Sequence, residues 1–225
     1  MIKITRLLFL LFIPLPVLAQ SEKENHYGAS LSVELEKDLN RFFSLALEEE
    51  VRLKNNPVGF DRSVTTFGFD YALFDRKLKF GVYYAFIYLY NDDSFFEPRH
   101  RSYFNISYKE TREAFTFSWR GRLQGTYRDE NRGRYKINPK YGMKNKIQIE
   151  YSIWGSPWKP FISCDISNDL NNPAGNELTR FRYQGGVVWR LNRTDYFEFF
   201  ARYDQYTAGN EANILAIGVS YKMKL

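Results

Sequence analysis

Hydrophobic and polar side chains alternate along most of the chain, and the stretch FTFSWRGRLQGTY, residues 115–127, shows the pattern clearly. Its apolar residues share one parity: Phe115, Phe117, Trp119 and Leu123. Its polar residues share the other: Arg120, Arg122, Gln124 and Thr126. Successive side chains of a β-strand point to opposite faces of a sheet, so the stretch predicts a strand with one apolar face. A soluble sandwich would bury that face in its core, whereas a transmembrane barrel would turn it toward lipid.

The same alternation recurs to the end of the chain, with polar turns between its instances. It predicts an all-β fold in one barrel domain, with strands at 27–36, 42–53, 62–73, 78–90, 101–109, 113–127, 141–154, 159–166, 177–191, 195–204 and 212–225. No stretch has the apolar spacing of an amphipathic helix.

The connections between these strands favour a transmembrane barrel over a sandwich. Short links alternate strictly with long ones, as in outer-membrane up-and-down antiparallel β-barrels, which have short periplasmic turns and longer external loops. Trp154 and Trp158 flank the short link 155–158, and Trp189 precedes another. Aromatic residues gather at membrane interfaces, so these tryptophans fit an inner aromatic girdle.

The pattern leaves two possible numbers of strands. Closing 42–53 on 212–225 gives ten antiparallel strands, and 27–36 is then an eleventh. An odd number cannot close an all-antiparallel barrel. We therefore favour twelve strands, with the additional one from residues 21–30 or within 128–140, and keep ten as the alternative.

The N-terminus has the features of a secretory signal peptide. Lys3 and Arg6 precede an apolar run, Leu7 to Leu18, and the small residues Val17 and Ala19 suit a cleavage site. The run is shorter than the roughly 20 residues of a spanning helix. We expect residues 1–19 to be the signal peptide and 20–225 to form an outer-membrane β-barrel in a Gram-negative cell.

Composition agrees with strands that keep two kinds of side chain apart. The chain is 18% aromatic and 26% charged, with a formal net charge of +6. This mild surplus is scattered, so we expect no nucleic-acid partner. A single cysteine, Cys164, excludes an internal disulfide framework. The expected partners are the lipid bilayer of the outer membrane and, during biogenesis, the barrel-assembly machinery.

The polar parity predicts a charged lumen rich in arginine. We expect its main network to comprise Arg120, Arg122, Gln124, Lys146, Glu150, Asp165, Arg180, Arg182, Glu198 and Arg202. Further charged residues of the inward parity are Lys79, Arg190, Glu48, Glu50, Asp70 and Asp204. Charges in a confined lumen need partners or water, and we expect Glu150 and Glu198 to neutralise the arginines. The network is then either a plug of paired charges or a selectivity surface for an anionic solute.

Catalytic chemistry has little support in the sequence. A Ser-His hydrolase needs a histidine oriented by a third group, and only His26 and His100 are present. We expect His100 to lie in an external loop at 91–100, where Glu97, Asp92 and Asp93 have no recognised metal-ligand spacing. We predict no catalytic, cofactor-binding or metal site, and no cofactor.

Several motifs resemble an outer-membrane barrel family of Gram-negative bacteria catalogued as domain of unknown function 2490. They are Arg120-x-Arg122-x-Gln124, NKIQIEY at 145–151, KPFIS followed by Asp165, and RFRYQGG at 180–186. Gln124 replaces the family's more frequent glutamate, and Leu225 replaces the usual terminal aromatic residue. The resemblance implies a barrel in the outer membrane but no reaction.

We therefore expect a porin-like but narrow passive channel, or a structural barrel, with an arginine-rich lumen. One alternative is a lipid-active or hydrolytic barrel enzyme. Another is surface recognition through external loops, for which Phe95, Phe96 and Tyr127 are the aromatic hints.

Overall fold

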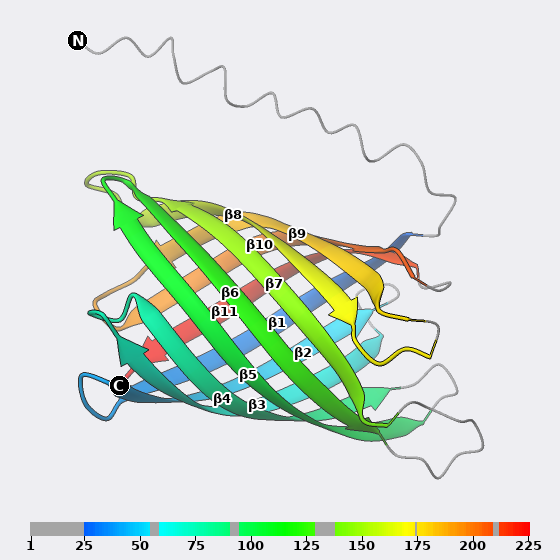
Figure 1. The fold of residues 1–225 in the computed structure, drawn as a ribbon. Coiled ribbons are helices and arrows are strands. Elements are labelled where there is room, and N and C mark those ends of the chain that lie inside the picture. Colours follow the sequence, from blue (N-terminus) through cyan, green and yellow to red (C-terminus); the bar gives the residue numbers. More distant parts are fainter. Residues whose placement is uncertain (1–24, 55–58, 91–94, 129–137, 174, 209–211) are drawn as a thin grey trace.

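A computed structural model describes residues 25–54, 59–90, 95–128, 138–173, 175–208 and 212–225. They form one closed barrel of eleven strands (Figure 1). The strands are β1 (Asn25–Asp38), β2 (Phe43–Lys54), β3 (Phe60–Leu73), β4 (Leu78–Tyr90), β5 (Phe96–Arg112), β6 (Phe115–Arg128), β7 (Lys140–Tyr151), β8 (Trp158–Asp169), β9 (Glu177–Arg190), β10 (Asp195–Tyr206) and β11 (Asn213–Lys224).

The barrel closes through a parallel pair of strands. Each strand pairs antiparallel with its neighbour in sequence, and β1 then pairs parallel with β11, from Asn25 opposite Asn213 to Glu36 opposite Lys224. The predictions of twelve strands and of ten are both wrong. An odd number of strands leaves the first and last strands pointing the same way. A parallel ladder between them can still pair their backbone N–H and C=O groups, with slanted hydrogen bonds.

The two ends of the barrel differ. One end carries the short connections 39–42, 74–77, 113–114, 152–157 and 191–194, together with the end of β11. The other end carries the connections after β2, β4, β6, β8 and β10, which are longer on average, and the start of β1, so the first strand begins and the last strand finishes at opposite ends of the barrel (Figure 1). We call these the short-turn end and the long-loop end. The expected signal peptide, residues 1–19, lies outside the described residues.

The second half of one predicted loop, residues 96–100, is in fact part of a strand. β5 begins at Phe96, so Glu97 and His100 belong to the sheet and not to an external loop at 91–100. The pairing of Arg99 with Arg128 and of His100 with Tyr127 extends the β5–β6 hairpin to this height. Pro98 and the charged residues around it masked the period-two pattern in the sequence.

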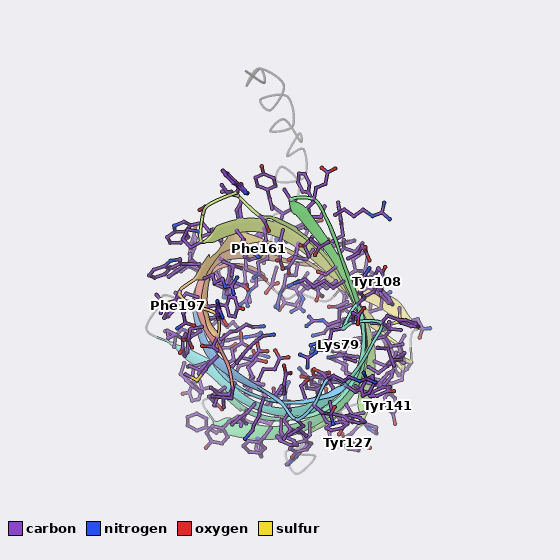
Figure 2. The ribbon with its side chains drawn as sticks, turned by 90° about the vertical axis from the view of Figure 1, so that its left-hand side faces the viewer. Lys79, Tyr108, Tyr127, Tyr141, Phe161 and Phe197 are labelled. Atoms are coloured by element: carbon purple, nitrogen blue, oxygen red, sulfur yellow. The ribbon has the colours of Figure 1, made fainter. Side chains whose placement is uncertain are left out.

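Apolar residues cover the outside of the barrel and polar residues line its inside. Phe115, Phe117, Trp119 and Leu123 are between 41% and 51% exposed, whereas Thr116, on the opposite parity, is buried. Figure 2 looks into the barrel and shows Lys79 projecting into the lumen, with Tyr127 and Phe197 projecting outward. None of the described residues forms a helix long and apolar enough to span a membrane.

Candidate functional site

The lumen is the part of the fold where charged side chains converge, and its two halves differ in sign. Carboxylates predominate toward the short-turn end: Glu34, Glu36, Glu48, Asp70, Glu150 and Glu198. Guanidinium groups predominate toward the long-loop end: Arg52, Arg62, Arg99, Arg101, Arg122, Arg180, Arg182 and Arg202. Lysines accompany the carboxylates, since Lys79 lies 3.4 Å from Glu36 and Lys222 lies 2.6 Å from Glu34.

Two ion pairs in the arginine-rich half are bidentate and partly buried. Arg182 holds Asp204 in a bidentate contact, Nε to Oδ1 at 2.5 Å and Nη2 to Oδ2 at 2.9 Å. Asp204 is only 2% exposed, and Arg202 approaches its second oxygen at 3.5 Å. Arg52 contacts Glu50 in the same bidentate manner, Nε to Oε1 at 2.8 Å and Nη2 to Oε2 at 2.6 Å. These arginines neutralise their partners and fix the wall of the lumen.

A row of four side chains crosses the lumen wall from β3 to β6. The Tyr83 hydroxyl donates to Asp70, 2.7 Å from each carboxylate oxygen. The Tyr83 ring stacks on Tyr103, with centroids 4.9 Å apart and planes 5° from parallel. Arg122 then lies over the Tyr103 ring at 3.9 Å from its centroid and donates to Asn105 Oδ1 at 2.9 Å. We call Asp70, Tyr83, Tyr103 and Arg122 the aromatic row.

Glycine makes this row possible. A Cβ atom on Gly68 would lie 2.0 Å from Cε1 of Tyr83, and one on Gly81 would lie 2.2 Å from Oδ1 of Asp70. The Tyr83 ring therefore lies against bare backbone of β3 and β4.

All the residues predicted for the lumen network lie on the inward parity of their strands, but their partners differ from our prediction. Glu150 accepts a hydrogen bond from Gln148 at 2.9 Å, and Glu198 accepts one from Gln184 at 3.0 Å. Neither forms a described salt bridge with an arginine, so that prediction is wrong. The register explains it, because β6 and β7 place Arg120 opposite Lys146 and Glu150 opposite Thr116.

The remaining members of the predicted network occupy intermediate positions. Asp165 is buried, lies opposite Lys146 on one side and Arg182 on the other, and accepts a hydrogen bond from Ser167 at 3.3 Å. The side-chain oxygen of Gln124 is buried without a hydrogen-bond partner. Arg120 and Lys146, which carry the same charge, lie opposite each other on β6 and β7.

Sequence reasoning missed several lumenal residues. Tyr83 lies in the run VYYAFIYLY, whose inward parity is itself apolar, so nothing distinguished it from a core residue. Arg101 was assigned to the edge of a strand, and Lys144 and Tyr103 were not singled out. The signal that could have found them was their position on the inward parity of each strand, as for Lys144 beside Lys146 on β7.

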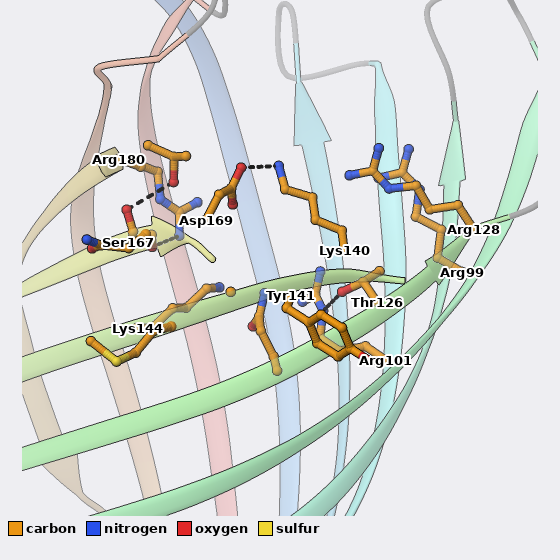
Figure 3. A pocket seen from close by; sticks show the side chains of 15 residues that line it. Arg99, Arg101, Thr126, Arg128, Lys140, Tyr141, Lys144, Ser167, Asp169 and Arg180 are labelled. Atoms are coloured by element: carbon orange, nitrogen blue, oxygen red, sulfur yellow. Dashed lines mark hydrogen bonds and ion pairs between the residues drawn. The ribbon is translucent and has the colours of Figure 1, made fainter. Parts of the chain in front are cut away.

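Some lumenal cations lack carboxylate partners. Arg101 donates to the Thr126 hydroxyl at 3.0 Å, and Arg180 donates to the Ser167 hydroxyl at 3.4 Å. Arg101, Arg122, Arg180 and Lys144 form no salt bridge with any carboxylate in the described ranges. Three of them, Arg101, Lys144 and Arg180, line a cavity of about 200 Å³ at the long-loop end (Figure 3).

His100 contacts aromatic residues on the outside of the barrel. It lies on the outward face of β5, where its Nδ1 meets the Tyr84 hydroxyl at 2.5 Å. Its ring also packs 5.4 Å from that of Phe86. Among the residues that the structure describes, no serine or carboxylate hydrogen bonds to His100, and no group of three side chains is suited to hold a metal ion.

The short-turn rim carries its own ion pairs. Arg76, in the turn 74–77, donates to Asp38 at 2.7 Å, and this hydrogen bond raises the pKa of the Arg76 guanidinium. Lys77 lies 3.0 Å from Glu110, whose hydrogen bond raises the pKa of the Lys77 ammonium. Both cations therefore stay charged, and they hold the turn against the ends of β1 and β5.

Comparisons with known proteins agree with the barrel. A family model described as protein of unknown function (DUF2490) matches residues 28–214, which confirms the resemblance seen in the motifs. A solved structure described as a bacterial polysaccharide outer membrane secretin is similar in fold, with a TM-score of 0.52 and 13% sequence identity. The alignment covers 83% of this chain and 63% of that one, so this chain spans less than two thirds of its length. No curated protein matches the chain.

Proposed function

The chain belongs to the DUF2490 family of proteins of unknown function, and we propose that it forms a narrow, anion-preferring channel in the bacterial outer membrane. In this proposal the long-loop end faces the outside of the cell and the short-turn end faces the periplasm. Residues 1–19 act as a signal peptide that is removed on export, and residues 20–225 form the barrel.

The outer surface supports insertion into a membrane. Exposed apolar and aromatic side chains such as Leu31, Val82, Ile147 and Ile217 cover it, with exposed fractions from 59% to 68%. Trp158 and Trp189 stack at 5.3 Å near the short-turn end, where a membrane interface would lie. A soluble protein rarely exposes so large an apolar surface, and a lipid environment removes its contact with water. The similar solved structure is described as an outer-membrane protein, which supports this proposed location.

The number of strands supports a narrow lumen. Barrels of eight strands are filled by their own side chains, whereas barrels of 16–18 strands leave an aqueous channel. Eleven strands lie between these limits. Long side chains project inward around the barrel in Figure 2, so they govern how much space is left.

The lumenal cations without salt bridges carry the functional proposal. In an ion pair such as Arg182 with Asp204, the two charges offset each other, so the pair exerts little net electrostatic attraction on a solute. Arg101, Arg122, Lys144 and Arg180 face the lumen and form no salt bridge with a carboxylate of the described residues. A charge in a confined space needs a counter-ion, so these side chains favour anions over cations along the path.

Recording from the refolded protein in a planar lipid bilayer tests this function. We expect conductance steps well below those of a trimeric porin, and a reversal potential in a potassium chloride gradient that indicates chloride preference. A large unselective conductance would contradict the narrow lumen, and cation preference would contradict the role of the four cations. Complete absence of conductance would contradict the channel and would favour a purely structural barrel.

A further inference from the structure

We propose that the cavity at the long-loop end is a binding site for a small molecule carrying phosphate-type charge, such as a diphosphate or a phosphate monoester. This inference rests on the proposed function only in that the lumen gives the ligand its access. The site would explain why this wall of the lumen gathers cations that form no salt bridge with any carboxylate of the described residues.

The lining of the cavity is strongly basic. Its basic members are Arg99, Arg101, Arg128, Lys140, Lys144 and Arg180. Among the described residues that line it, Asp169 is the one carboxylate, and Lys140 already binds it at 2.5 Å (Figure 3). Arg99 is likewise engaged, because its Nε lies 2.7 Å from Glu97. Among the other basic residues of the lining, Arg101, Lys144 and Arg180 form no salt bridge with a carboxylate of the described residues.

The register brings two of these cations to one serine. Ser167 of β8 lies opposite Lys144 of β7 on one side and opposite Arg180 of β9 on the other. Neighbouring strands are about 4.8 Å apart, so the two cations stand roughly 10 Å apart with a hydroxyl between them. Like charges so placed repel each other unless an anion lies between them. Arg101 faces the same cavity from β5, so positive charge surrounds the space on several sides.

Unused hydrogen-bonding groups point to the same ligand. Nε of Arg180 is buried and has no hydrogen-bond partner, and the Lys144 ammonium forms no salt bridge with a described carboxylate. Guanidinium groups match phosphate oxygens in a bidentate geometry, and lysine binds phosphate as a point charge. Ser167 adds a hydroxyl that can donate to a phosphate oxygen.

The size of the cavity limits the ligand. A single water needs about 10–15 Å³ in this measure, so about 200 Å³ holds considerably more than one water or chloride ion. It is smaller than the 300–1,000 Å³ typical of pockets for drug-sized ligands. A compact anion with two or more charges fits these limits, whereas an extended chain would fit only by one of its charged groups.

Titration calorimetry on the refolded full chain in detergent tests the site, with inorganic pyrophosphate as the probe and orthophosphate and acetate as comparisons. We expect pyrophosphate to bind more tightly than orthophosphate, and acetate to bind weakest. Lys144→Gln and Arg180→Gln should each weaken pyrophosphate binding at least about tenfold, since each removes a charge-assisted hydrogen bond. Arg62→Gln is the matched control, because it removes one charge at the same end of the lumen outside the cavity, where Arg62 pairs with Asp61.

A second measurement needs no variant and so does not depend on whether a substitution folds. Pyrophosphate should slow reductive methylation of Lys144 in the wild-type protein, as followed by mass spectrometry, and should leave Lys79 unprotected. No measurable binding, equal weakening by Arg62→Gln, or equal protection of both lysines would overturn the site. Anion-preferring conductance without pyrophosphate binding would remove the site and leave the channel, whereas binding without conductance would do the reverse.

Discussion

Lys222 of β11 and Glu34 of β1 meet across the parallel seam of the barrel, with Nζ 2.6 Å from the carboxylate oxygen. The two residues are also direct partners in the register of the seam. A second pair, Lys224 with Glu36, lies one step further along at 3.4 Å. The odd number of strands therefore closes with two pairs of opposite charges in register, and a slip of the seam by two residues would keep only one of them.

The first prediction concerns this seam. The Lys222 side chain is 48% exposed, so we expect a coupling of only about 0.5–1 kcal/mol between Lys222 and Glu34. A double-mutant cycle with Lys222→Ala and Glu34→Ala, measured by urea unfolding, gives this coupling free energy. The exchanged pair, Glu34→Lys with Lys222→Glu, should recover most of the loss. Additive effects of the two alanine substitutions would show that the contact contributes nothing.

The second prediction concerns the aromatic row. Gly68→Ala places a methyl group where the Tyr83 ring lies, so the ring must leave Tyr103 and Asp70. Overpacking of this kind costs about 1–3 kcal/mol of unfolding free energy. Gly185→Ala is the control, because the nearest atoms to its Cβ lie at 3.9 and 4.0 Å. In a Tyr83→Ala background the cost of Gly68→Ala should disappear, and its persistence there would contradict the packing described.

The strands themselves were readable from the sequence, whereas their closure was not. Alternation is a local property, so FTFSWRGRLQGTY and its counterparts identified all eleven strands and the outward face of Phe115, Phe117 and Trp119. The parallel pairing of β1 with β11 joins residues almost two hundred positions apart, and no local pattern encodes it. The same limit applied to the lumen, because the partners of Arg120 and Arg182 depend on the register of each hairpin.

The third prediction concerns orientation. Because β1 begins at the long-loop end, an epitope tag inserted before Asn25 should bind antibody on intact cells. A tag inserted in the turn 191–194 should become accessible only after the outer membrane is permeabilised. The reverse pattern of accessibility would show that the barrel has the opposite orientation in the membrane. Accessibility of both tags from the same side would contradict the odd number of strands.

The fourth prediction separates a membrane barrel from a soluble one. Ile147 lies in the middle of β7 and is 59% exposed, so Ile147→Arg should cost about 2–4 kcal/mol if it faces the centre of a bilayer. Leu191→Arg, in the turn 191–194, should cost about 0–1 kcal/mol near the interface. Unfolding from lipid vesicles gives both values. An equal, small cost for both would indicate that water surrounds the barrel, since exposed substitutions in soluble proteins stay within about 0.5 kcal/mol.

The most direct measurement of the central claim is the reversal potential of the wild type and of Arg122→Gln in the same potassium chloride gradient. Arg122 faces the lumen, contacts Tyr103 and Asn105, and forms no salt bridge with a described carboxylate. We predict chloride preference in the wild type and a clearly smaller preference in the variant, with conductance steps of similar size. Cation preference in the wild type, or a reversal potential that Arg122→Gln leaves unchanged, would contradict the account.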